Sequence, residues 1–134
     1  MHAQWRKTAL VVDDEAFARL YAVQMLLDQG WFVLEAADAE EGLDMLVAQD
    51  DLALLLTDIS MPGEMDGLDL VERARRHQPE IAIVVTSGQT IPSAERLPEG
   101  ARFLPKPYTA FALNEAIGAH SEPFAHEERI VLRA

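Results

Sequence analysis

Aspartates and a lysine stand where short apolar runs of this sequence end. Asp13 and Asp14 follow one such run, Asp58 follows a second, and Lys106 follows a third. Carboxylates serve as nucleophiles or metal ligands, and a lysine supplies a compact positive charge. A lone acid could equally cap a helix or lie in a solvated loop. The chemistry of these residues therefore depends on whether the surrounding elements bring them together.

The segments around these residues alternate between strand-like and helix-like patterns. Strands are predicted over Thr8–Val12, Phe32–Ala36, Leu52–Thr57, Ile81–Thr86 and Arg102–Leu104. Helices are predicted over 15–29, from Asp38 to about Ala48, over 66–77 and over 109–119, with Phe111 among the last helix's packing residues. Such alternation predicts an α/β fold, because right-handed crossovers build a parallel sheet with helices on both faces.

The carboxyl ends of parallel strands share one edge of the sheet, and neighbouring strands are only ~4.8 Å apart. We therefore expect Asp13, Asp14, Asp58, Thr86 and Lys106 to converge. Two unit charges ~4 Å apart repel by about 4 kcal/mol at an effective dielectric near 20, so grouped carboxylates require a cation. The same repulsion predicts that Asp13→Asn raises the melting temperature of the metal-free protein.

Oxygen ligands without histidine or cysteine suit a hard ion such as Mg²⁺. The chemistry that needs this set is phosphoryl transfer to a carboxylate, in which Asp58 is the nucleophile, Lys106 contributes charge and Thr86 a hydroxyl.

Composition narrows the class of protein. The chain has 134 residues, of which 49% are hydrophobic, enough for one compact core. A formal net charge of −12 without a basic cluster argues against nucleic-acid binding. The first apolar run is too short for a signal peptide or a membrane span, so we expect a cytoplasmic protein that does not bind membranes. Cysteine is absent, which excludes disulfides.

Four motifs in order along the chain, VVDDE, LLLTDISMPGEMDGLDL, VVTSG and FLPKPY, resemble the receiver domain of bacterial two-component response regulators. The resemblance implies a flavodoxin-like five-stranded parallel sheet of order 2-1-3-4-5. It also implies that Asp58 takes a phosphoryl group from a histidine kinase or a histidine phosphotransfer protein. Signalling would follow through phosphorylation-dependent protein contacts or a phosphorelay, rather than through turnover of an external substrate.

The resemblance further assigns roles to individual residues. It implies that Asp14, Asp58 and the backbone carbonyl of Ser60 bind Mg²⁺, with Asp13 acting through the waters of the metal.

On the same grounds, Thr86 and Lys106 would hold the phosphoryl oxygens, and Phe103 would swing inward with Thr86 on activation. The bond between Lys106 and Pro107 would be cis.

Two features depart from the family pattern. Glu64 resembles a one-residue insertion in the loop after Asp58. The segment over 88–100 carries Pro92 and Pro98, and proline inside a helix costs about 3 kcal/mol. We therefore expect a short or irregular fourth helix, with a turn or two around 93–97.

The last residues of the chain lie beyond the motifs that resemble the receiver domain. We expect a receiver domain over 1–120 and a tail over 121–134, which is either disordered or forms an edge strand near Ile130 and Leu132. We expect no output domain after the tail, and therefore a stand-alone, chemotaxis-regulator-like receiver, although a fragment of a hybrid kinase fits equally. The sequence is compatible with a monomer and with a phosphorylation-dependent homodimer.

The helix over 15–29 has an apolar stripe that includes Ala22 and Leu26, while Phe17 and Leu20 lie partly outside it. These outer residues are either buried or form a patch that contacts the phosphodonor, as the same helix does in the family.

Three other functions compete with this interpretation. A pseudo-receiver that binds partners without being phosphorylated would ordinarily lack part of the five-residue set. An aspartate-dependent phosphohydrolase usually has a second acid where this chain has Ser60. A flavin-binding protein would present amides and hydroxyls, whereas Asp13 and Asp14 would repel a phosphate.

Overall fold

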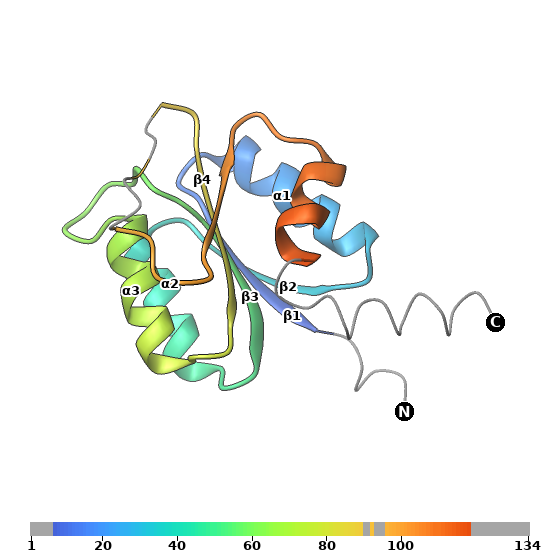
Figure 1. Ribbon diagram of the computed structural model, residues 1–134. Helices are drawn as coiled ribbons and strands as arrows, with labels where there is room; N and C mark the ends of the chain where they lie inside the picture. Colours follow the sequence, from blue (N-terminus) through green and yellow to red (C-terminus); the bar gives the residue numbers. More distant parts are fainter. Residues whose placement is uncertain (1–6, 90–91, 93–95, 119–134) are drawn as a thin grey trace.

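A computed structural model describes residues 7–89, 92 and 96–118 of the chain. Its centre is a parallel five-stranded sheet of order β2-β1-β3-β4-β5, which confirms the predicted order (Figure 1). The strands are β1 (Thr8–Val12), β2 (Phe32–Ala36), β3 (Leu52–Asp58), β4 (Ala82–Ser87) and β5 (Arg102–Pro105). The buried, β-branched and leucine-rich runs predicted these strands because a sheet covered on both faces requires apolar residues on both sides.

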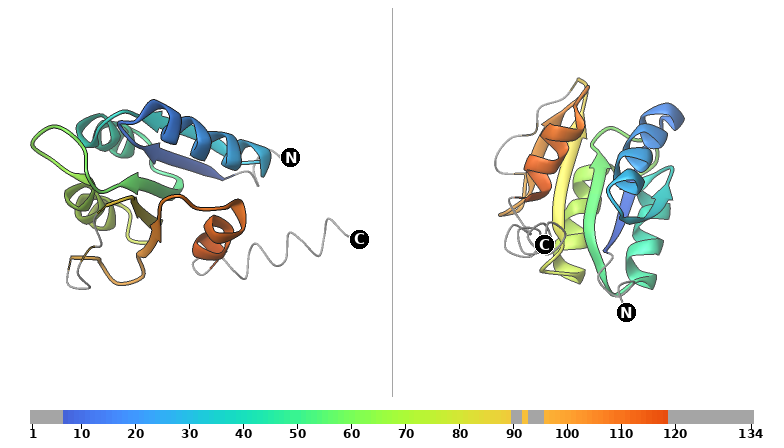
Figure 2. Two further views of the ribbon diagram at one scale, coloured as in Figure 1. Left: turned by 90° about the horizontal axis from the view of Figure 1, so that it is seen from above. Right: turned by 90° about the vertical axis from the view of Figure 1, so that its right-hand side faces the viewer.

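The helices cover both faces of the sheet. They are α1 (Ala16–Asp28), α2 (Ala39–Ala48) and α3 (Gly67–His77), and residues 110–118 are also helical. The helices α2 and α3 lie on one face, and α1 and the helical residues 110–118 lie on the other (Figures 1 and 2). Within the described ranges, no helix combines the length and apolar character needed to cross a lipid bilayer.

Two apolar clusters fill the spaces between the sheet and the helices. On one face, Leu10 and Ile83 pack with α2 and α3, and on the other, Val11 and Val84 pack with α1 and the helical residues 110–118. The prediction that Phe111 packs into the core is wrong. Its side chain is 73% exposed because Leu113 and Ile117 occupy the inward face of that helix.

Side chains cap the first turns of α2 and α3. Asp38 accepts a hydrogen bond from the backbone N–H of Glu41, and Asp66 accepts one from the backbone N–H of Asp69, as aspartate at a helix start favours. The helix α1 lacks such a cap at Glu15.

The described part of the segment over 88–100 forms turns and no helix. Arg96 lies beside α3, with its guanidinium 3.6 Å from the carboxylate of Asp69 and 3.8 Å from that of Glu72. Most of the turn expected around 93–97 and all of the predicted tail over 121–134 lie outside the described residues.

Candidate functional site

The predicted residues meet at the carboxyl edge of the sheet. Asp58 is the last residue of β3 and pairs in register with Thr86 of β4. Lys106 directly follows β5, and its Nζ lies 2.8 Å from Oδ2 of Asp13 and 3.6 Å from Oδ2 of Asp58. Residues separated by 93 positions in the sequence are thus hydrogen-bonded, although β3 and β4 lie between the strands that precede them.

Carboxylates that directly follow β1 and that end β3 form an oxygen-rich cluster. One oxygen from each of Asp13, Asp14 and Asp58 lies within 4.8 Å of the others. Asp13 and Asp58 are buried, whereas Asp14 is exposed. The cluster is therefore open to solvent on one side and contains only hard oxygen donors, which is the ligand set that Mg²⁺ prefers.

Burial and the neighbouring charges shift the pKa values of Asp58 and Lys106. Burial raises the pKa of Asp58, and the neighbouring charges of Asp13 and Asp14 raise it further, against the lowering influence of Lys106 and of the Ile59 N–H. Burial alone would lower the pKa of Lys106. The hydrogen bond and charge of Asp13, with the charge of Asp58, outweigh that influence and raise it.

Asp13 is fixed by contacts from several elements. Its Oδ1 accepts a hydrogen bond of 2.9 Å from the backbone N–H of Glu15. Its backbone carbonyl accepts one of 2.8 Å from the guanidinium of Arg19, which also forms an ion pair of 2.9 Å with Glu35 of β2. Sequence reasoning missed Arg19. The only signal was its place one turn into the helix that follows the two aspartates.

The backbone around Asp58 is tightly packed. The Ile59 N–H donates to Oδ1 of Asp58 at 2.9 Å, and the Thr57 hydroxyl donates to the Asp58 carbonyl at 2.9 Å. A Cβ added to Gly67 would lie 1.8 Å from that carbonyl oxygen. The first residue of α3 must therefore be glycine for the loop to return over the strand end.

The other predicted site residues occupy neighbouring positions. Ser60 is exposed in the loop after β3, and Thr86 is buried at the end of β4. Phe103 of β5 is partly buried and packs against the cluster under α2 and α3. The Lys106–Pro107 peptide bond is cis, as the resemblance implied.

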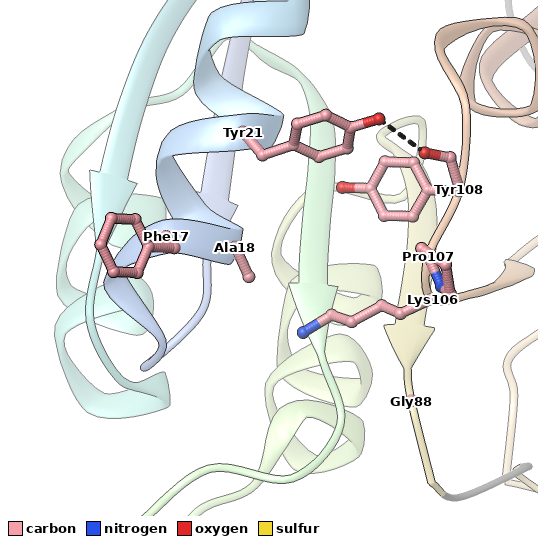
Figure 3. Close-up of a pocket in the computed structure, with 7 residues that line it drawn as sticks. All are labelled: Phe17, Ala18, Tyr21, Gly88, Lys106, Pro107 and Tyr108. Carbon is pink, nitrogen blue, oxygen red and sulfur yellow. Dashed lines mark hydrogen bonds between the residues drawn. The ribbon is translucent and has the colours of Figure 1, made fainter.

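A hollow of about 460 Å³ lies beside Lys106 (Figure 3), the residue whose Nζ contacts Asp13 and Asp58. It is lined by Phe17, Ala18, Tyr21, Gly88, Lys106, Pro107 and Tyr108. The Tyr21 hydroxyl donates a hydrogen bond of 2.9 Å to the backbone carbonyl of Tyr108, which ties α1 to the segment after Lys106. Burial, with smaller contributions from Asp13 and Tyr21, raises the pKa of Tyr108 to about 12, so its hydroxyl remains protonated.

The apolar residues predicted to lie outside the stripe of α1 are exposed. Phe17 is 88% exposed and Leu20 is 58% exposed, while Ala22 and Leu26 are buried. An aromatic side chain in water at the rim of the hollow leaves apolar surface available for contact with another molecule.

Metal-free stability should depend on pH through Asp58. Its folded pKa lies above the ordinary value of 3.8, so the native state binds more protons and stability falls as pH rises past that value. Asp58→Asn removes this loss. The difference in unfolding free energy between Asp58→Asn and wild type should therefore grow from about pH 4 to about pH 7, measured by urea denaturation with a chelator. A constant difference would contradict the account.

Asp13 is less suited to this test than the repulsion argument suggested. Replacing it would relieve repulsion but also break the 2.8 Å ion pair with Lys106. Relief of repulsion would raise the melting temperature, whereas loss of the ion pair would lower it.

The strand order and the acidic edge define a doubly wound, flavodoxin-like α/β protein. Comparison with known proteins specifies the family. The response regulator receiver domain matches residues 9–118, and the chain belongs to this family.

Related sequences and structures agree. The chain is 35% identical over 106 residues to the sensor kinase CckA of Brucella abortus, covering 76% of this chain and 11% of that protein. A response regulator receiver protein from Sinorhizobium medicae shares the fold with a TM-score of 0.80 and 28% identity, covering 90% of this chain and 95% of that one. The receiver domain of the hybrid histidine kinase CckA gives a TM-score of 0.72 at 33% identity, covering 84% and 97%. The chain spans 11% to 24% of the length of the curated relatives it matches.

Proposed function

We propose that this receiver domain is a phosphoacceptor: Asp58 takes a phosphoryl group from a histidine kinase or a histidine phosphotransfer protein in a Mg²⁺-dependent reaction. The observation that carries the proposal is the position of the Asp58 carboxylate, 3.6 Å from Lys106 Nζ and within 4.8 Å of the other two acids. A buried carboxylate beside a cation and two further acids suits charge-stabilised transfer to oxygen.

Mg²⁺ fits the donor set of this edge. Asp14, Asp58 and the carbonyl of Ser60 would hold the ion, with Asp13 acting through its waters. Burial, together with the charges of Asp13 and Asp14, raises the pKa of Asp58, and a bound cation would oppose this shift. When bound, the ion would neutralise charge on the transferring group.

Side chains of the protein attack the phosphoryl group and bind its oxygens. An Oδ of Asp58 attacks the phosphorus, the bond from phosphorus to the donor nitrogen breaks, and the imidazole of the donor leaves. The ammonium of Lys106 would bind one phosphoryl oxygen, and the hydroxyl of Thr86 would bind another. Lys106 is prepared for this role because its pKa is raised and it remains charged.

Activation would couple Thr86 to Phe103, as the resemblance implies. Support comes from their proximity along the strands: Thr86 is the register partner of Leu104, the residue that directly follows Phe103. Movement of the Thr86 hydroxyl toward a phosphoryl oxygen would leave space toward β5, into which the partly buried Phe103 ring could turn. The modified face would then bind a downstream protein or pass the phosphoryl group on.

The phosphodonor would dock on α1 and the hollow. Phe17 supplies exposed apolar surface there, and Lys106 lies in the wall of the hollow. A protein bound to this surface would thus reach the edge of the sheet that carries Asp58 without crossing the sheet.

We assign residues 1–120 to the receiver domain and 121–134 to a tail.

A second candidate is the pseudo-receiver, which binds partners without phosphorylation. The complete acid, hydroxyl and amine set at one edge favours the phosphoacceptor instead.

The test is intact-mass measurement after incubation with acetyl phosphate. With Mg²⁺ the protein should gain the mass of one phosphoryl group, because the ion offsets the repulsion that an incoming phosphoryl group would meet from the acids. With a chelator it should gain none. A protein that stays unmodified in both conditions, while a known receiver in the same tube is labelled, would favour the pseudo-receiver.

A further inference from the structure

The loop between β3 and α3 carries Glu64, which resembles a one-residue insertion, and Ser60, the proposed carbonyl ligand. Its two ends are joined by a backbone hydrogen bond of 2.8 Å from the Gly67 N–H to the Ile59 carbonyl. The loop is therefore closed at its base, whereas the position of its middle depends on contacts with other elements.

Glu40, in the first turn of α2, contacts the middle of this loop. A single carboxylate oxygen, Oε2, accepts hydrogen bonds from the backbone N–H groups of Glu64 at 3.2 Å and Met65 at 3.3 Å. A Cβ added to Gly63 would lie 2.9 Å and 3.0 Å from the two oxygens of Glu40. Three consecutive loop residues thus wrap around one carboxylate from another element.

The conformation of Gly63 suits this arrangement. Its φ is +105°, a value that side chains rarely allow, and the chain turns there so that the next two amides face Glu40. The inserted residue itself donates one of the two bonds. The insertion is therefore accommodated by a fixed contact.

We propose that Glu40 is a positioning residue for the metal site: it holds the lengthened loop so that the Ser60 carbonyl is in place before the ion binds. The inference rests on the proposed function. Without this contact, the loop would have to be ordered when the ion binds, which weakens the observed affinity.

We expect a moderate loss of Mg²⁺ affinity when Glu40 is replaced. Groups that hold metal ligands in place typically contribute about 10- to 100-fold to affinity. Glu40 is exposed and acts through backbone atoms, so we expect a smaller loss, about fivefold, for Glu40→Ala.

Charge must be separated from positioning, because Glu40 also adds a negative charge that attracts a cation. Asp44→Ala removes the same charge from an exposed position of α2 and serves as the matched control. Glu40→Gln removes the charge but keeps an oxygen that can accept both amides, since one oxygen accepts both in the structure.

The experiment measures the Mg²⁺ dissociation constant of the four proteins by calorimetry, and amide exchange of residues 64 and 65 without metal. Glu40→Ala should bind about fivefold more weakly than Asp44→Ala and exchange those amides faster, whereas Glu40→Gln should behave like Asp44→Ala. Equal affinities for Glu40→Ala and Asp44→Ala, or a glutamine variant as weak as the alanine one, would overturn the inference alone. A wild-type protein that binds no Mg²⁺ would overturn the proposed function as well.

Discussion

Asp58→Asn should abolish phosphoryl incorporation from acetyl phosphate in the presence of Mg²⁺. The amide oxygen is a far weaker nucleophile than a carboxylate, and the other buried acid of the cluster, Asp13, already accepts hydrogen bonds on both oxygens, from the Glu15 N–H and from Lys106 Nζ. The fold should persist, because asparagine keeps the oxygen that accepts the Ile59 N–H. Intact-mass measurement should show no added phosphoryl group after an incubation that fully labels wild type.

The control for this prediction is Asp44→Asn, which makes the same chemical change on the exposed face of α2. It should be labelled like wild type. Equal labelling of Asp58→Asn would show that another side chain accepts the phosphoryl group and that the site assignment is wrong.

Gly67→Ala should strongly destabilise the protein. The added Cβ would lie 1.8 Å from the carbonyl oxygen of Asp58 and 2.9 Å from Cα of Ile59, and both are backbone atoms that cannot rotate away. The strand end or the start of α3 would have to shift, at a cost of about 3 kcal/mol or more. For a domain of this size we expect the melting temperature to fall by roughly 10 °C, measured by calorimetry.

Gly118→Ala is the matched control, because nothing lies within 4 Å of a Cβ added at that helical position. There the change should be neutral or stabilise by up to about 1 kcal/mol. A Gly67→Ala protein as stable as wild type would mean that the loop after Asp58 can adopt a different path.

Much of this molecule follows from sequence patterns that have a physical cause. The apolar runs predicted the strands, and their shared edge predicted that Asp58 and Lys106 would meet. Capping at Asp38 and Asp66 followed from side chains that can accept the first free N–H groups of a helix. These features depend on local periodicity and on the geometry common to all parallel sheets.

The parts that could not be predicted depend on how far side chains reach between elements. Nothing in the spacing of Arg19 or Glu40 shows that one binds the carbonyl of Asp13 and the other binds loop amides. The sequence also does not show that Lys106 lies closer to Asp13, at 2.8 Å, than to Asp58, at 3.6 Å. The exposure of Phe111 could not be predicted, because helical periodicity allowed more than one orientation of that helix.

Arg19 connects three elements through one rigid planar group, since it rises from α1, holds the end of β1 and pairs with β2. The guanidinium of Arg19 therefore links α1 to the backbone of Asp13, the first acid of the cluster. A shift of α1 at this point would stretch the hydrogen bond to the Asp13 carbonyl and the ion pair with Glu35. A protein that displaced α1 would therefore disturb the backbone beside the carboxylate cluster.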